Sequence, residues 1–179
     1  MNILFVCTGN TCRSPMAEAL LKDALKIAGR ENEHEVLSAG INAAPGDRVS
    51  AGAAEALAEI GIDITGQPAD QIHEELLWQA DLILTMTHFH TVILQSNFPE
   101  LSDKIYTFGD YLNQHLDQEM IASEGMTDAE NCETKSENED LKVGVYFSDV
   151  LDPFGGSIEV YRQSRDQLAR MVAALMRYI

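Results

Sequence analysis

Residues 3–14 read I-L-F-V-C-T-G-N-T-C-R-S, and this stretch decides the fold. Its first four residues, Ile3 to Val6, are too few for a helix and predict a short parallel strand buried on both faces. After the stretch, Pro15 to about Ala28 follows the apolar period of a helix, with Ser14 as the expected N-cap and Pro15 as the first helical residue. The stretch therefore predicts a strand, a tight loop and a helix in succession.

The loop between this strand and helix carries a cysteine at its start and an arginine six positions later. Gly9 and Asn10 allow a tight, left-handed turn, and such a loop at a helix N-terminus can surround an anion with backbone N–H groups. The same groups favour the thiolate of Cys7, and the planar guanidinium of Arg13 can bind two phosphoryl oxygens at once. The alternative is that the cysteine is a buried structural residue and the arginine a surface residue, but this interpretation does not explain the spacing between Cys7 and Arg13. The pattern indicates a nucleophilic thiolate beneath a bound oxyanion.

Strand and helix patterns alternate along the rest of the chain, which predicts an α/β fold with a parallel sheet and helices on both faces, and so three layers. Further strands are expected at Glu35–Gly40, Asp81–Met86 and Lys104–Phe108, and further helices at Ser50–Ile60, Asp70–Trp78, His88–Gln95 and Ser157–Tyr178. Ligands of such sheets bind at the carboxyl ends of the strands, which is where the loop after Cys7 lies.

Composition limits the classes of function. A chain of 179 residues with 45% apolar content predicts a single domain over residues 1–179. The formal charge of −17 argues against a nucleic-acid or anionic-membrane partner.

Neither a secretory signal nor a run of about 20 apolar residues is visible, so a cytoplasmic location is expected. Three cysteines, Cys7, Cys12 and Cys132, cannot form a disulfide framework. No ligand spacing for a metal appears, so neither metal nor cofactor is expected.

Four segments resemble a known family. V-C-T-G-N-T-C-R-S-P-M-A, residues 6–17, is similar to the phosphate loop of low-molecular-weight protein tyrosine phosphatases, and closer still to their bacterial protein-arginine phosphatase branch. Residues 38–40 (S-A-G), 80–86 (A-D-L-I-L-T-M) and 152–156 (D-P-F-G-G) resemble further family segments. The likeness spans residues 1 to about 114 and 149–179. It implies a four-stranded sheet in the order 2-1-3-4 and a phosphatase that acts on phosphorylated proteins.

The resemblance also assigns roles to residues. Asp152, in an Asp-Pro pair that by itself suggests a turn, becomes the general acid that protonates the leaving group after Cys7 attacks phosphorus. The backbone N–H groups of residues 8–13, together with Arg13, would stabilise the phosphoryl oxygens. The predicted substrate-binding residues are Thr8, Gly9, Asn10, Thr11, Cys12, Ser14 and Phe154.

Supporting roles leave alternatives open. Asn10 is expected to hold the loop in a strained shape, and Ser14 to donate to the Cys7 sulfur. Ser38 either braces Asn10 or is a plain turn serine. Cys12 either captures an oxidised Cys7 as a disulfide or is a packed loop residue.

Two histidines follow the expected strand at residues 81–86. His88 and His90 either line the rim of the site, or cap the next helix, or are satisfied surface histidines.

Two positions bear on the substrate. Thr11 stands where tyrosine-directed relatives tend to carry a larger aliphatic residue, and Phe154 where many carry tyrosine. Both choices resemble the arginine-phosphatase branch, so phosphoarginine is the predicted substrate and phosphotyrosine the alternative. A thioredoxin-coupled arsenate reductase shares this loop but needs relay cysteines, and residues 80–90 contain none.

One segment departs from the family pattern. Residues 117–140 hold nine acids against one base, Lys135, and predict a mobile surface loop within an acidic insertion at about 115–148. Either the insertion is solvated and has no function of its own, or it is an acidic loop that recruits a partner or a substrate. Cys132 within it is expected to be an incidental exposed thiol, with a redox role as the alternative.

Overall fold

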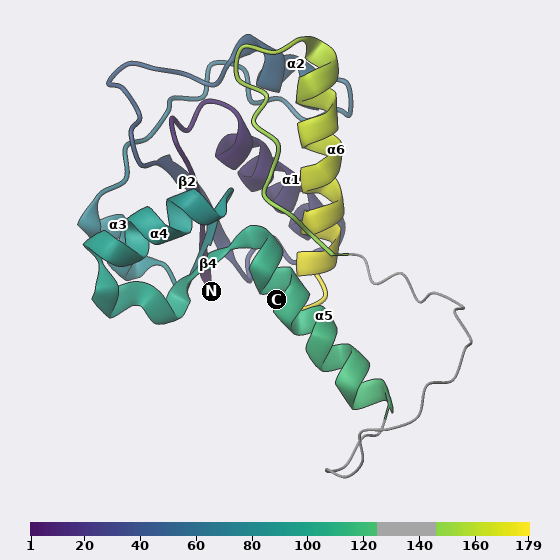
Figure 1. Cartoon of the computed structure of the whole chain (residues 1–179). Helices are drawn as coiled ribbons and strands as arrows, with labels where there is room; N and C mark the ends of the chain where they lie inside the picture. The colour runs from purple at the N-terminus through teal and green to yellow at the C-terminus, as the bar shows by residue number, and fades with distance from the viewer. Residues whose placement is uncertain (125–145) are drawn as a thin grey trace, which may run out of the picture.

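A parallel sheet forms the centre of the molecule (Figure 1). The computed structural model describes the backbone of residues 1–124 and 146–179 and the side chains of residues 1–116 and 146–179. The strands of this described part are β1 (Asn2–Cys7), β2 (Glu35–Gly40), β3 (Leu82–Thr85) and β4 (Ile105–Thr107), all parallel. Their order is β2-β1-β3-β4, which confirms the order that the family resemblance implied.

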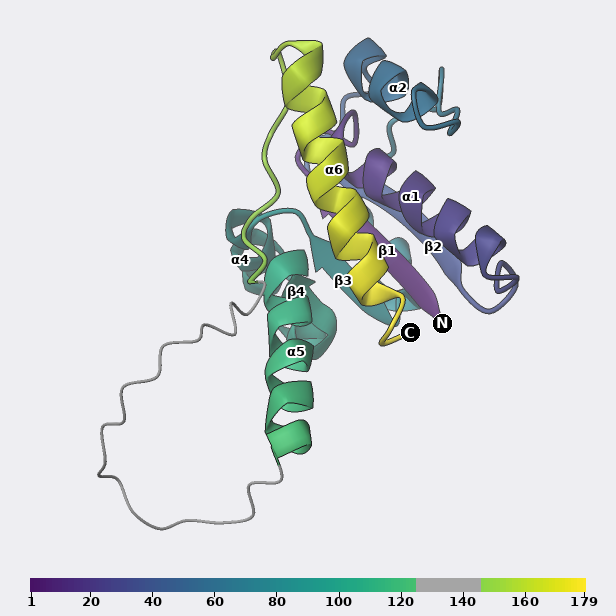
Figure 2. The same ribbon diagram turned by 90° about the vertical axis from the view of Figure 1, so that its right-hand side faces the viewer.

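Helices cover both faces of the sheet, so the three-layer prediction is confirmed. The helices are α1 (Arg13–Ile27), α2 (Ala51–Ala58), α3 (Glu74–Gln79), α4 (His88–Asn97), α5 (Phe108–Glu124) and α6 (Ile158–Leu175), with a 3-10 helix η1 (Pro99–Lys104) before β4. In Figure 1, α3 and α4 lie on one side of the sheet and α1 and α6 on the other. Figure 2 shows α6 in front of β1 with α1 beside it.

The alternation of side chains along β1 divides the core in two. Ile3 and Phe5 belong to the cluster built with α1, α5 and α6, whereas Leu4 and Val6 belong to the cluster built with α3, α4 and η1. Both sets are fully buried, and each such side chain contributes about 1.5–3 kcal/mol on burial. β1 is therefore fixed from both faces, and its last residue delivers the loop of residues 8–12 to the edge of the sheet.

Two helix starts differ from the predictions. α1 begins at Arg13 with Cys12 at the N-cap, so the prediction of Ser14 as N-cap was wrong; its hydroxyl instead lies 3.0 Å from the Cys7 sulfur. The helix predicted from Asp70 begins only at Glu74, after His73 as N-cap. Residues 70–72 stay extended because the backbone of Gly40 bonds to them on both sides, through Asp70 C=O and Ile72 N–H.

The predicted acidic loop was wrong in its first residues. α5 continues to Glu124, past the expected loop start at Asp117. Phe108 and Leu112 anchor its first turns in the core, and residues of good helix propensity follow them. Residues 125–145, including Cys132, lie outside the described residues, and the single domain over residues 1–179 stays a prediction. No helix in the described ranges is long and apolar enough to cross a membrane.

Candidate active site

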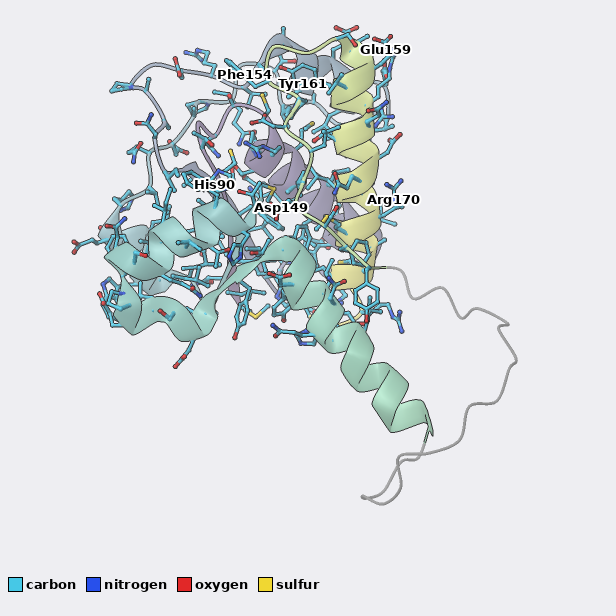
Figure 3. All side chains as sticks on the ribbon, in the orientation of Figure 1. His90, Asp149, Phe154, Glu159, Tyr161 and Arg170 are labelled. Carbon is cyan, nitrogen blue, oxygen red and sulfur yellow. The ribbon has the colours of Figure 1, made fainter. Side chains whose placement is uncertain are left out.

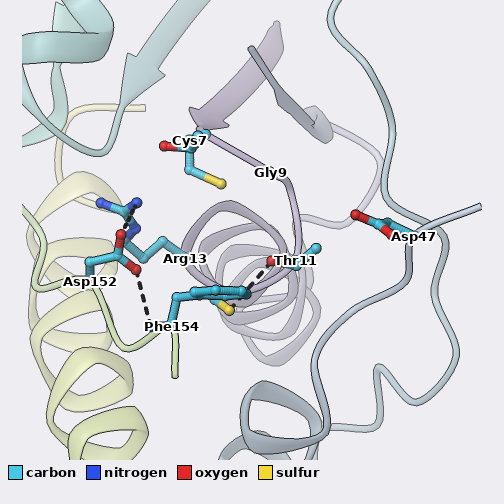
Figure 4. A pocket seen from close by; sticks show the side chains of 9 residues that line it. Cys7, Gly9, Thr11, Arg13, Asp47, Asp152 and Phe154 are labelled. Carbon is cyan, nitrogen blue, oxygen red and sulfur yellow. Dashed lines mark hydrogen bonds and ion pairs between the residues drawn. The ribbon is translucent and has the colours of Figure 1, made fainter. Parts of the chain in front are cut away.

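A pocket of about 250 Å³ opens at the carboxyl end of β1. Eight predicted site residues line it, joined by one acid that the sequence did not indicate (Figure 4): Cys7, Thr8, Gly9, Thr11, Cys12, Arg13, Asp152 and Phe154, with Asp47. Asn10, Ser14 and Ser38 are buried and do not line the pocket. The predicted site residues therefore fall into two groups, those that line the pocket and those that are buried behind it.

The Cys7 sulfur receives polar contacts from two sides. The backbone N–H of Asn10 donates to it over 3.2 Å, and Ser14 Oγ lies 3.0 Å away. The side-chain amide of Asn10 donates to Ser14 Oγ over 2.9 Å. The single hydroxyl hydrogen of Ser14 can therefore point at the sulfur, 3.0 Å away, or at Ala39 O, 3.4 Å away, and the sulfur is the nearer of the two. This arrangement suits a thiolate, because both neighbours can present a hydrogen to it.

Asn10 connects the loop to the rest of the fold. Its φ of 52° lies in the left-handed region, which asparagine tolerates better than most residues. Its side chain donates to Ser38 Oγ over 2.8 Å and accepts from the N–H of Asp70 over 2.8 Å. Ser38, a residue of β2, in turn donates to Glu18 over 2.6 Å. A continuous hydrogen-bond network therefore reaches from the thiol to α1.

Gly40, at the end of β2, permits this loop to lie against the sheet. A Cβ at this position would stand 2.7 Å from Thr8 O and 2.8 Å from Asn10 N, closer than real Cβ contacts. The backbone just beyond it holds the loop, since Ile41 N–H donates to Cys7 O and Asn42 N–H to Thr8 O. The S-A-G segment therefore matters through the glycine as well as the serine.

Two substitutions of Asn10 should separate the contribution of the strained turn to stability from that of the hydrogen-bond network. We expect Asn10→Gly to lower the free energy of unfolding by about 2–4 kcal/mol, because two buried hydroxyl groups and the partly buried N–H of Asp70 lose their partner. Asn10→Ala should cost about 1 kcal/mol more, because alanine resists the left-handed conformation. Urea denaturation of the two variants measures both effects. Equal stabilities of the two variants would contradict the strain, and wild-type stability of the glycine variant would contradict the network.

Arg13 and Asp152 meet across the pocket although 139 positions separate them. Arg13 Nη2 lies 2.8 Å from Asp152 Oδ2, and the arginine is buried while the aspartate is half exposed. The segment before Asp152 is held by Val150 N–H to Met86 O and by Ser164 Oγ to Leu151 O. α6 and the end of β3 thus place the acid opposite the loop.

The remaining lining residues differ in exposure. Phe154 is 74% exposed, and its backbone N–H donates to Asp152 Oδ1 over 3.1 Å. Cys12 is buried, with its sulfur 3.2 Å from Ser50 Oγ and 3.7 Å from Tyr161 OH. Cys7 and Cys12 are free thiols. Both interpretations of Cys12, redox partner and packed residue, stay predictions.

His90 supports the loop from the first turn of α4, where Figure 3 labels it. Its Nε2 lies 2.9 Å from Thr8 Oγ1 and its Nδ1 2.7 Å from Thr87 Oγ1. His90 is 2% exposed, so the surface-histidine interpretation was wrong for this residue, whereas His88 is exposed. Burial, and then the positive charge of Arg13, lower the pKa of His90 to about 4. The ring is therefore neutral at pH 7, with one nitrogen donating and the other accepting.

The lowered pKa of His90 predicts a dependence of stability on pH. Between about pH 6.5 and pH 4 the unfolded chain binds a proton at this histidine and the folded chain does not, so acidification destabilises the fold through this residue by about 3 kcal/mol at most. His90→Gln removes this proton binding, while the other titrating groups remain. We expect the stability advantage of the wild type over His90→Gln, from urea denaturation, to shrink from pH 7.5 to pH 4.5. A constant difference over that range would contradict the prediction.

Several supporting residues were not predicted from the sequence: Glu18, Asp47, Asp70, Tyr161 and, as a buried group, His90. Each lies in an ordinary helix or loop pattern, and only the tertiary fold brings it to the site. The one available signal was the Thr-x-x-His pattern of Thr87 and His90 at the start of a helix.

The chain resembles known phosphatases along its length. The family "Low molecular weight phosphotyrosine protein phosphatase" matches residues 2–128. A protein-arginine-phosphatase of Bacillus subtilis is 39% identical over the whole of this chain and 97% of its own length. The low-molecular-weight protein-tyrosine-phosphatase PtpB of Staphylococcus haemolyticus is 32% identical over 98% of this chain and 97% of its own. A solved structure of YwlE arginine phosphatase, a cysteine-to-serine mutant with a phosphorylated active-site serine, is 37% identical with a TM-score of 0.77, covering 99% of this chain and 95% of that one.

Proposed function

The chain belongs to the low-molecular-weight phosphotyrosine protein phosphatase family, and from this premise we propose that it hydrolyses phosphoarginine on proteins through a phosphocysteine intermediate. Family membership confirms the resemblance seen in the sequence. The observation that carries the proposal is the meeting of Cys7, Arg13 and Asp152 in one pocket. A thiol, a phosphate-binding guanidinium and a carboxyl group are what a two-step phosphoryl transfer without a metal requires.

In the first step the Cys7 thiolate attacks phosphorus. The S–P bond forms as the P–N bond to the guanidinium breaks, and the leaving nitrogen takes a proton from Asp152. The N–H groups of residues 8–13 and the guanidinium of Arg13 bind the three equatorial oxygens. In the free enzyme Arg13 pairs with Asp152. When the substrate binds, the phosphoryl oxygens compete with the Asp152 carboxylate for the guanidinium of Arg13.

In the second step water replaces the thiolate. Asp152, now a carboxylate, accepts a proton from the water, whose oxygen attacks phosphorus while the S–P bond breaks. Inorganic phosphate leaves, and the Cys7 thiolate is restored. Ser14 and the Asn10 N–H, both within hydrogen-bond distance of the sulfur, stabilise the departing thiolate.

The preference for phosphoarginine rests on Thr11 and on the relatives named protein-arginine-phosphatase. Thr11 lines the pocket, with its hydroxyl 3.6 Å from the Cys12 sulfur. Phosphotyrosine is the second candidate, supported by the family name and by PtpB. The exposed ring of Phe154 offers a flat face to either leaving group.

Replacement of Thr11 tests the substrate. We expect the wild type to prefer a phosphoarginine peptide over the matched phosphotyrosine peptide. Thr11→Ile should lower kcat/KM for phosphoarginine about 10–100-fold, because it removes a hydroxyl and adds bulk to the pocket. Phosphate release from both peptides is the measurement. Thr11→Val, which keeps the shape and removes only the hydroxyl, separates polarity from size.

Two outcomes would contradict this assignment. A wild type that prefers phosphotyrosine, with no change in Thr11→Ile, would favour the tyrosine phosphatase. A wild type that releases phosphate from neither peptide would remove both candidates.

The setting of the enzyme is also part of the proposal. Its partners are phosphorylated proteins, and nucleic acids, membranes and metals are not expected among them. A cytoplasmic location suits an enzyme that needs a reduced thiol, and Cys7 and Cys12 are unpaired. The acidic segment is proposed as an insertion into a single domain.

A further inference from the structure

We infer that Asp47 is a specificity-determining residue that binds the guanidinium group of the substrate. This inference rests on the proposed function, since it requires phosphoarginine as the substrate. Asp47 lines the same pocket as Cys7 and Arg13. In Figure 4, Asp47 and Asp152 lie on opposite sides of this pocket, with Thr11 and Phe154 between them.

The backbone around Asp47 is fixed to the phosphate loop. Asp47 N–H donates to Ala44 O over 3.1 Å, and Ala69 N–H donates to Asp47 O over 2.9 Å. Three residues later, Ser50 N–H donates to Thr11 O over 2.8 Å. The carboxylate is therefore carried by a segment whose backbone is bonded directly to the loop, so the fold sets the place of the Asp47 backbone relative to the phosphate loop.

The charges in the pocket leave Asp47 available for a ligand. The guanidinium of Arg13 is engaged by Asp152, and Arg48, next in the chain, donates to Gly66 O instead. Within residues 1–116 and 146–179, no hydrogen bond or ion pair engages the Asp47 carboxylate, which is exposed. The pocket thus has the Arg13–Asp152 ion pair on one side and, at its mouth, the carboxylate of Asp47, which has no partner among the described residues.

This distribution of charge matches one class of phosphorylated side chain. Phosphoarginine carries an anionic phosphoryl group directly on a delocalised cation with several N–H donors. With its phosphoryl group on the loop, that cation lies toward the mouth, where a carboxylate can accept its hydrogen bonds. The phenyl ring of phosphotyrosine has neither a charge nor an N–H group to offer there. A carboxylate at this point also repels the phosphoryl group, because both are negative. It therefore favours binding only of a substrate that carries a cation next to its phosphoryl group.

The test compares the ratio of kcat/KM for phosphoarginine and phosphotyrosine peptides among charge variants. We expect Asp47→Asn to lower this ratio about three- to fivefold at low salt and Asp47→Lys about tenfold or more, mainly through KM for phosphoarginine. Asp47→Glu, which keeps the charge, should retain most of the ratio. The differences should shrink as salt screens the mouth. Asp103→Asn is the matched control, because η1 precedes β4 and lies at the end of the sheet away from the site.

Each result supports or overturns the inference. A ratio that is unchanged in Asp47→Lys, or that falls equally in Asp103→Asn, overturns the role of Asp47 while phosphoarginine hydrolysis by the wild type still stands. A wild type that releases no phosphate from the phosphoarginine peptide overturns the proposed function, and the inference with it. A fall in the ratio confined to the Asp47 variants, with the inhibition constant of inorganic phosphate unchanged or slightly lower, supports the inference.

Discussion

Replacing Cys7 by serine is expected to lower kcat by about 10⁴-fold or more, because a serine hydroxyl stays protonated at neutral pH and its neighbours cannot act as a base. The groups around the sulfur, the Asn10 N–H and Ser14 Oγ, serve to present hydrogens to an anion. Serine has nearly the shape of cysteine, so the fold should persist. Phosphate release measures the loss, and circular dichroism during heating checks that the melting temperature is retained.

A second thiol in the same loop provides the control. Cys12→Ser makes the same chemical change, but the Cys12 sulfur faces Ser50 and Tyr161 and has no part in the proposed attack. We expect this variant to lose about tenfold at most. If Cys7→Ser kept a tenth of the wild-type kcat, the thiolate mechanism would be wrong.

The sequence was most informative where neighbouring residues build a unit by themselves. The apolar run of β1, the Gly9-Asn10 turn and the helix after Pro15 predict the strand, loop and helix that the structure contains. The boundaries were less predictable because tertiary contacts decide them. Residues 70–72 pair with Gly40 instead of joining a helix, and α5 continues past the predicted loop start because its first turns are anchored in the core.

The sequence predicted those residues of the site that lie together in one loop. Cys7 and Arg13 share that loop, whereas Asp152 came from family resemblance, since an Asp-Pro pair alone suggests a turn. No local pattern distinguishes Glu18, buried beneath Ser38, from the other acids of an amphipathic helix. The sequence pattern around Asp47 is likewise that of a solvated loop acid. Backbone bonds on both sides of it, from Asn42 N–H to Thr8 O and from Ser50 N–H to Thr11 O, bring its segment to the pocket. Such residues act through neighbours that are distant in sequence.

Replacing Asp152 by asparagine should lower kcat for phosphoarginine about 10²–10⁴-fold, the usual range for the loss of a general acid and base. The amide can still contact Arg13 but can neither give nor accept the proton. The loss in the first step should be smaller for an aryl phosphate with a good leaving group, because such a phenolate leaves without protonation. Because the second step also needs Asp152, this variant should release a burst of phenol and then turn over slowly. Stopped-flow absorbance measures both phases.

The control for Asp152 lies three residues earlier. Asp149→Asn makes the same change in an acid that accepts from the backbone N–H of His88 and does not line the pocket, so we expect a loss of about threefold at most. A burst in Asp152→Asn with slow turnover would assign the residue to both steps. Equal losses for phosphoarginine and the aryl phosphate, without a burst, would mean that Asp152 only orients Arg13. Orientation of Arg13 is the main rival explanation, because the two side chains form a 2.8 Å ion pair. The dependence of the loss on the leaving group distinguishes this role from acid–base catalysis, because orientation of a phosphate-binding group affects all substrates alike.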